Sequence, residues 1–64
     1  MKTKRTLRGI RNDLGMTQKE MADKIGCSQA MYQRYERNEV IIPVNLLIKM
    51  ADMVGIVDVR EIAL

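Results

Sequence analysis

Hydrophobic residues recur along the first part of the chain at the three- and four-residue spacing of a helix. Leu7, Ile10 and Leu14 share one helical face, and Gly15 follows them as a residue that stops helices. The pattern predicts a first helix from about Lys4 to Leu14.

The second predicted helix begins with a capping box. Thr17 and Glu20 have the Thr-x-x-Glu spacing, in which each side chain accepts a hydrogen bond from the backbone N–H of the other residue. The helix is expected to start at Gln18 and to stop at Gly26, about two turns later. Its buried residues are Met21, Ala22 and Ile25.

The third predicted helix follows after a very short turn. Only Gly26, Cys27 and Ser28 separate it from the second helix, and Ser28 is a favourable N-cap. We expect the helix to run from Gln29 to about Arg37. Asn38 is expected to end it in the left-handed conformation.

A fourth helix is predicted after the apolar segment 40–42. Pro43 suits the first position of a helix, because its φ is fixed and that position needs no N–H donor. Gly55 is expected to end the helix. The buried stripe consists of Leu47, Met50, Ala51 and Val54.

A third cap signal predicts a short final helix. Asp58 and Glu61 have Asp-x-x-Glu spacing, and the helix would continue through Leu64. Segments 40–42 and 56–57 are β-like in composition, but each is too short for a strand and lies between helix signals. The pattern therefore predicts an all-α fold of five short helices without strands.

Composition limits the chain to one small domain, 1–64. A core of 64 residues is near the lower limit for folding alone, and the single Cys27 with no His excludes an internal disulfide or a zinc site. Stability must come from helix packing, with a partner subunit expected. No signal peptide or apolar run of about 20 residues occurs, so we expect a cytoplasmic protein that does not bind membranes.

The same composition argues against an enzyme. There is no His, and the Asp and Glu residues stand among Lys and Arg, mostly at the spacing of a solvated helix face. The chain is also too small to enclose a substrate cleft. We expect no catalytic residues, no cofactor, no metal and no small-molecule ligand.

Positive charge is concentrated in the N-terminal half. The net charge is +3, yet residues 1–15 hold five Lys or Arg and a single acidic residue, whereas residues 39–64 hold two basic and four acidic residues. Such asymmetry suits a polyanion that approaches from one side.

The third predicted helix has two chemically different faces. Ser28, Met31, Tyr32 and Tyr35 occupy one side, where the tyrosines are expected to pack in the core. An arc of roughly 140° on the other side contains no acidic residue. Its members are Gln29, Ala30, Gln33, Arg34 and Arg37. Amides, guanidinium groups and a methyl group match what bases present in the DNA major groove, although a surface helix can carry Gln and Arg for solubility alone.

Residues 17–36 resemble the helix-turn-helix of the Cro/C1 (XRE) repressor family. The family pattern has Thr-Gln opening the second helix, Ala in its middle, Gly in the turn, Ser at the start of the third helix and Glu near its end. The matching residues are Thr17, Gln18, Ala22, Gly26, Ser28, Tyr32, Tyr35 and Glu36. The similarity extends to residues 7–14 and 47–62. It implies a compact five-helix, lambda-repressor-like DNA-binding domain with its helix-turn-helix at about 17–37.

The resemblance also implies roles for individual residues. Gln18 would bind a backbone phosphate beside Thr17, and three residues would meet base edges: Gln29, Ala30 and Arg34. Ser28, Gln33, Arg37 and Asn38 would contact bases or nearby phosphates. Arg11 and Glu36 would form a structural ion pair, the alternative being two independent surface charges.

The loop after the third helix departs from the family. Family members often have Gly after the Glu and then a basic loop, whereas residues 39–42 here are acidic and apolar. This loop could cover the core, reach phosphate through its backbone, or join the C-terminal helices in a dimer contact. The predicted function is a homodimeric regulator, expected to be a repressor, that binds a pseudo-palindromic double-stranded operator. The alternative is a protein-interaction module of the same fold, such as an antitoxin or antirepressor.

Overall fold

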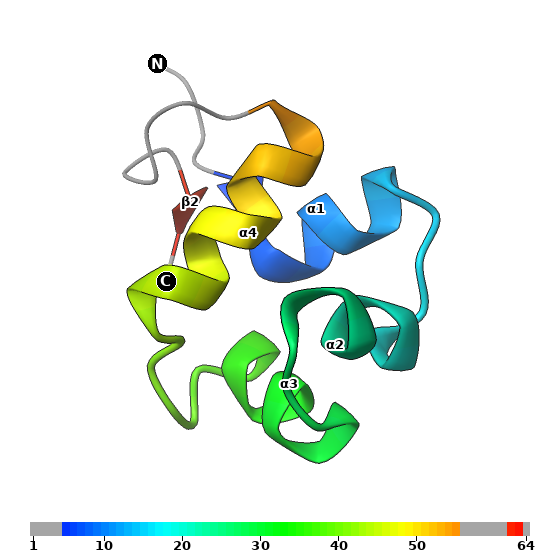
Figure 1. The fold of residues 1–64 in the computed structure, drawn as a ribbon. Helices are drawn as coiled ribbons and strands as arrows, with labels where there is room; N and C mark the ends of the chain where they lie inside the picture. The colour runs from blue at the N-terminus through cyan, green and yellow to red at the C-terminus, as the bar shows by residue number, and fades with distance from the viewer. Residues whose placement is uncertain (1–4, 56–61, 64) are drawn as a thin grey trace.

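Four helices dominate the computed structural model, which describes residues 5–55 and 62–63 (Figure 1). The elements are β1 (Arg5–Thr6), α1 (Leu7–Asp13), α2 (Gln18–Ile25), α3 (Gln29–Glu36), α4 (Val44–Val54) and β2 (Ile62–Ala63). The first four predicted helices are therefore confirmed.

Helix α1 begins three residues later than the hydrophobic pattern predicts, because Thr6 is its N-cap. The Thr6 hydroxyl accepts a hydrogen bond from the Gly9 N–H at 3.0 Å, and the Thr6 backbone is extended. A Cβ atom at position 9 would lie only 3.0 Å from that hydroxyl oxygen. Glycine inside this helix therefore leaves space for the capping side chain.

Helices α2 and α3 begin where the sequence predicts. Thr17 N donates to Glu20 Oε1 at 2.9 Å and Glu20 N donates to Thr17 Oγ1 at 3.1 Å, which completes the capping box. Gly26 ends α2 with a φ of 89°, a left-handed conformation that favours glycine. Ser28 then caps α3 by accepting a hydrogen bond from Met31 N at 3.1 Å.

A Schellman motif ends α3. Asn38 has a φ of 60°, so the predicted left-handed terminator is confirmed. Its N–H donates to the carbonyl of Tyr35 at 3.2 Å, and the N–H of Glu39 donates to the carbonyl of Arg34 at 3.0 Å. The chain therefore folds back over the last turn of the helix.

Helix α4 begins one residue later than predicted. Pro43 is the N-cap rather than the first helical residue, because its ψ of 144° is extended while its carbonyl accepts from the N–H groups of Leu46 and Leu47. Gly55 ends the helix in the left-handed conformation, as expected.

The C-terminal prediction needs correction. Most of the fifth helix expected from Asp58 lies outside the described residues, so the count of five helices is not confirmed. Where the expected helix would end, Ile62–Ala63 instead pair with Arg5–Thr6 as a short parallel ladder, contrary to the expectation of no strands. The Ile62 side chain is buried, with 3% of its surface exposed. The backbone of Thr6, which is extended because this residue is the N-cap of α1, provides the strand with which β2 pairs.

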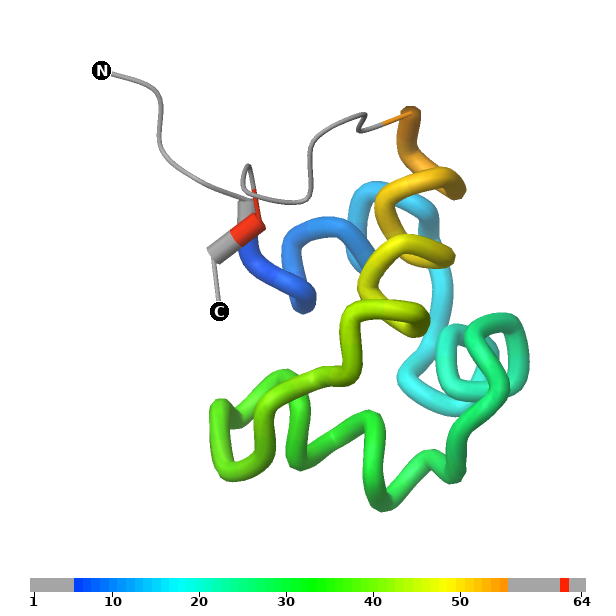
Figure 2. Tube along the Cα trace, turned by 60° about the vertical axis from the view of Figure 1, so that its left-hand side comes forward, coloured from blue at the N-terminus to red at the C-terminus, as the bar shows by residue number. Residues whose placement is uncertain are grey.

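The core lies between the helices and is apolar. Its largest fully buried side chains are Tyr32, Ile10, Met21, Ile25 and Met50. Helix α2 packs on α3, while α1 also contacts α3 and α2 also contacts α4. Helix α3 lies along the lower edge of the molecule in both views, and the C-terminal end of α4 lies at the opposite end (Figure 2). No helix among the described residues is long and apolar enough to cross a bilayer.

Candidate DNA interface

The two faces of α3 are separated as the helical pattern predicts. Tyr32 and Tyr35 are 0% and 6% exposed, so both tyrosines are core residues. Gln29, Ala30 and Arg34 are exposed on the helix, Gln33 is half-buried, and Arg37 and Asn38 are exposed just beyond its end. The structure therefore leaves amide and guanidinium groups accessible along the outer side of α3.

Thr17 and Ser28 are exposed, but both hydroxyl groups already cap helices. The caps fix where α2 and α3 begin. In the first turn of a helix, the N–H groups have no acceptor within the helix, so those of Gln18 and Lys19 can meet an anion.

Arg11 and Glu36 form a buried ion pair that joins α1 to the end of α3. Arg11 Nε lies 2.7 Å from Glu36 Oε2, and Arg11 Nη2 donates to Glu36 Oε1 at 3.4 Å. The Glu36 side chain has no exposed surface, and that of Arg11 is 14% exposed. Arg11 Nη1 also donates to the carbonyl of Met16 at 3.0 Å, which fixes the approach to α2.

Two further side chains contact the same carboxylate. Gln18 Nε2 donates to Glu36 Oε1 at 3.1 Å, and Arg8 Nε lies 3.5 Å from that oxygen while its side chain stays 64% exposed. Neither contact was predicted from the sequence. The three-residue spacing of Arg8 and Arg11 on one helical face was a usable signal for the Arg8 contact, whereas nothing local indicates the Gln18 contact.

The charge on Glu36 is stabilised by its donors. Burial alone would raise the pKa of this carboxyl, but the hydrogen bonds from Arg11 and Gln18 outweigh burial and hold the pKa below its usual value of 4.5. The hydrogen bond to Glu36 likewise raises the pKa of Arg11. Burial raises the pKa of the Tyr32 hydroxyl, and the neighbouring Glu36 carboxylate raises it further.

Glu39 faces the arginines at the end of α3. Its carboxylate lies 3.9 Å from Arg34 Nε and 3.7 Å from Arg37 Nη1. The acidic character of the loop is evident from the sequence, but its position beside the outer side of α3 is not. The helical spacing rules do not extend past Asn38, where the helix ends in a left-handed turn.

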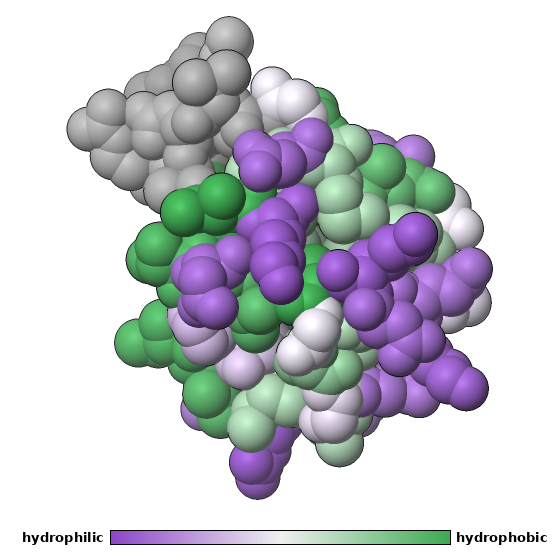
Figure 3. Space-filling view, viewed as in Figure 1, coloured by the Kyte–Doolittle hydropathy of each residue, from purple (hydrophilic) through white to green (hydrophobic). Residues whose placement is uncertain are grey.

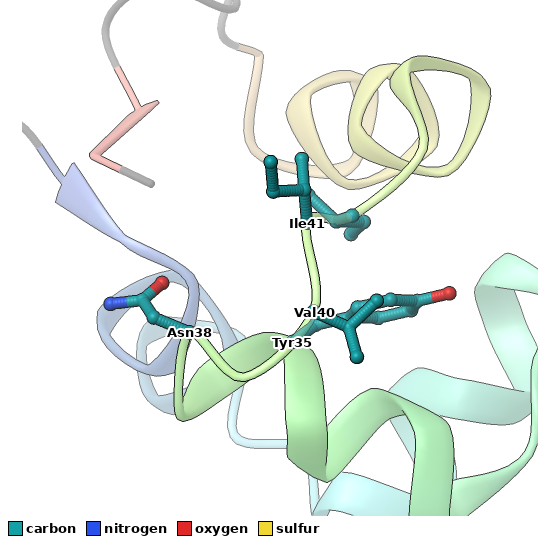
Figure 4. A pocket seen from close by; sticks show the side chains of 5 residues that line it. Tyr35, Asn38, Val40 and Ile41 are labelled. Atoms are coloured by element: carbon teal, nitrogen blue, oxygen red, sulfur yellow. The ribbon is translucent and has the colours of Figure 1, made fainter.

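The apolar loop is divided between the core and the surface. Ile42 is 4% exposed and covers the core, whereas Val40 and Ile41 are 37% and 83% exposed. Together with Val44 and Ile48, they are the exposed large hydrophobic residues of the described part of the chain, called here the apolar patch. Figure 3 shows hydrophobic surface, in green, along the left side of the molecule. In Figure 4, Ile41 projects outward from the loop, beside a shallow pocket lined also by Tyr35 and Asn38.

The described residues contain no group of three or more His, Cys, Asp or Glu side chains that could hold a metal ion.

Comparison with known protein families matches residues 7–62 to the family described as helix-turn-helix. This range includes helices α1 to α4. The chain belongs to the helix-turn-helix family. It is a member of the Cro/C1 type, as the residues of α2 and α3 predict. No solved structure matches the chain significantly.

A curated relative supports this assignment. Over 56 residues, the chain is 39% identical to the cryptic phage CTXphi transcriptional repressor RstR of Vibrio cholerae serotype O1 (strain ATCC 39315 / El Tor Inaba N16961). The match covers 88% of this chain and 50% of the relative, so the chain spans about half the length of that protein.

The buried ion pair of this helix-turn-helix predicts a specific loss of stability in acid. Because the folded-state pKa of Glu36 is depressed, its contribution to the free energy of unfolding is complete above the unfolded pKa, near 4.5, and disappears as the pH falls through the lower folded-state pKa. Urea unfolding of the wild type at several pH values should show this decline.

Glu36→Gln is the matched variant, since it keeps the shape and removes the titrating group. It should be less stable than wild type at pH 7, because Arg11 loses its buried partner, and the difference should shrink as the pH falls below 4.5. A difference that stays constant from pH 7 to pH 3 would contradict the role given to Glu36.

Proposed function

We propose that the chain is a sequence-specific regulator of transcription that binds double-stranded DNA through α3. Its family membership and its similarity to a phage repressor support DNA-binding regulation. The observation that carries the proposal is the exposed outer side of α3, where Gln29, Ala30 and Arg34 are accessible and no residue of that face is acidic. These residues belong to one helix-turn-helix domain, proposed to span 1–64 and to act in the cytoplasm.

The exposed groups on α3 match the chemistry of the major groove. Gln29 can pair with adenine N6 and N7, Arg34 can donate two hydrogen bonds to guanine O6 and N7, and the Ala30 methyl group can contact thymine. We propose that these three residues read bases. Residues near the ends of the same face would contact bases or flanking phosphates: Ser28, Gln33, Arg37 and Asn38.

Gln18 is proposed to hold a DNA phosphate at the start of α2. One hydrogen of its Nε2 group is donated to Glu36, which restrains the side chain and leaves a second hydrogen for a phosphate oxygen. The adjoining backbone N–H groups and the positive end of the α2 dipole favour an anion there, next to Thr17.

The proposed binding unit is a homodimer. A two-fold arrangement would place two copies of α3 in successive major grooves, about 34 Å apart, over a pseudo-palindromic operator. Repression would follow where the operator overlaps a promoter. The apolar patch begins just after α3 in sequence, and a two-fold axis through it would bring two copies of the patch together, so it is the proposed contact between subunits.

The second candidate function is a protein-interaction module of the antitoxin or antirepressor kind. The apolar patch favours it, because exposed Ile41, Val44 and Ile48 would suit a different protein as well as a second copy. Salt dependence separates the two functions, since only binding to DNA releases condensed counterions.

Selection of binding sites from random duplex DNA, followed by salt titration, tests the proposed function. The wild type should enrich one pseudo-palindromic sequence and bind it with a log–log salt slope of several units. Arg34→Ala should lower affinity by about 1–3 kcal/mol per half-site and relax the preference at one base pair, whereas Gln18→Ala should weaken binding to all sequences alike.

Arg34→Lys is the matched control, because it keeps the charge but lacks the two-pronged donor geometry. It should relax the base preference and leave the salt slope unchanged. Selection that enriches no sequence, together with binding that does not respond to salt, would refute a DNA-binding function.

Substitution in the apolar patch tests the dimer. Ile41 is 83% exposed, so Ile41→Ser should leave thermal unfolding of a subunit nearly unchanged while weakening self-association about tenfold or more, because each dimer loses two apolar contacts. Sedimentation equilibrium measures the dissociation constant. Asp23→Ser, at an exposed position on α2, is the control and should leave it unaltered. Equal dimerisation by Ile41→Ser and wild type would exclude the patch as the subunit contact.

A further inference from the structure

Glu39 holds an acidic group next to the face that is proposed to read DNA. Its position is set by the backbone, since its own N–H closes the Schellman motif on the carbonyl of Arg34 at 3.0 Å. Asn38, in the left-handed conformation, turns the chain so that this occurs. The backbone of this turn therefore places Glu39 beside the last turn of α3.

The Glu39 carboxylate lies near the guanidinium groups of two arginines. The carboxylate lies 3.9 Å from Nε of Arg34 and 3.7 Å from Nη1 of Arg37. All three side chains are about half exposed, at 59%, 58% and 49% for Arg34, Arg37 and Glu39. They are therefore accessible to DNA, and the ion pairs are too weak to prevent an exchange of partners.

We propose that Glu39 is a specificity-determining residue that competes with DNA phosphates for Arg34 and Arg37. The inference rests on the proposed function, because it assigns Glu39 to the same α3 surface. Glu39 suppresses binding to non-specific DNA more strongly than it suppresses binding to the operator.

The two kinds of binding differ because Arg34 makes different contacts in the non-specific complex and in the operator complex. Non-specific binding is supplied by phosphate contacts, so it requires Arg34 and Arg37 to leave the carboxylate, and it suffers from repulsion between Glu39 and the phosphates. At the operator, the terminal amino groups of Arg34 pair with a base while its Nε remains beside Glu39. The carboxylate then restrains a base-reading side chain, and this offsets the repulsion.

Glu39→Gln tests the proposal, with the selected operator duplex and a scrambled duplex of equal length as probes. The variant should bind the scrambled duplex about two- to fivefold more tightly and with a salt slope steeper by about 1 per subunit. Its affinity for the operator should change less, so the ratio of the two affinities should fall. Thermal unfolding should match wild type, since the backbone hydrogen bonds of the turn remain.

Two controls isolate the mechanism. Asp52→Asn removes the same charge from an exposed position near the C-terminal end of α4, far from α3 in Figures 1 and 2, and should leave the ratio unchanged. In an Arg34→Ala background, Glu39→Gln should still tighten binding to scrambled DNA through Arg37, but should alter the affinity ratio much less.

Each outcome supports or overturns the proposal. Equal tightening on both duplexes would show a general charge effect, and an unchanged affinity for scrambled DNA would show no competition; either result overturns the role of Glu39 while the DNA-binding function stands. Wild-type protein that binds neither duplex would overturn the proposed function and the role of Glu39 together.

Discussion

The buried ion pair between Arg11 and Glu36 is the interaction on which the arrangement of the first three helices depends. Removing two charges from water costs several kcal/mol per ion, and only close pairing with further hydrogen bonds offsets this cost. Here Glu36 accepts from Arg11 and Gln18, while Arg11 also donates to the Met16 carbonyl. The pair therefore joins the end of α3 to α1 and to the start of α2, and these contacts hold only in one relative placement of the helices.

That placement connects folding to recognition. The carboxylate that holds α1 and α3 together also holds Gln18, so the proposed phosphate ligand is attached to the helix whose outer side is proposed to read bases. The buried side of α3 has a separate task, with Tyr32 and Tyr35 packed in the core. Just beyond its end, the Schellman turn places Glu39 beside two arginines and leads into the apolar patch. One short segment thus combines the proposed base-reading face, the proposed electrostatic control by Glu39 and the proposed subunit contact.

Local signals in the sequence were sufficient for most of the fold. The capping box at Thr17, the Ser28 cap and the left-handed residues Gly26 and Asn38 depend on neighbours within a few residues, so the sequence shows them directly. The start of α1 was misplaced because the Thr6 cap has glycine, rather than glutamate, three residues later. The pairing of β2 with β1 joins segments far apart in the chain, and no local pattern reports such a contact.

The candidate site was predictable in its residue types but not in its contacts. Helical periodicity separates the outer face of α3 from its buried face, and the resemblance to Cro/C1 proteins suggested that Arg11 and Glu36 meet. The hydrogen bond from Gln18 to Glu36 spans 18 residues, and the approach of Glu39 to Arg34 and Arg37 depends on the path of the chain after Asn38. Both contacts depend on how the segments are placed in three dimensions, and the periodicity of the sequence does not predict this.

The most direct test of the account is to map amide chemical-shift changes by NMR as double-stranded DNA is added to isotope-labelled protein. The account predicts that the largest changes occur at the start of α2, at Thr17 and Gln18, and along residues 28–37, with small changes in the second half of α4. Changes confined to the apolar patch, with none along α3, would contradict it.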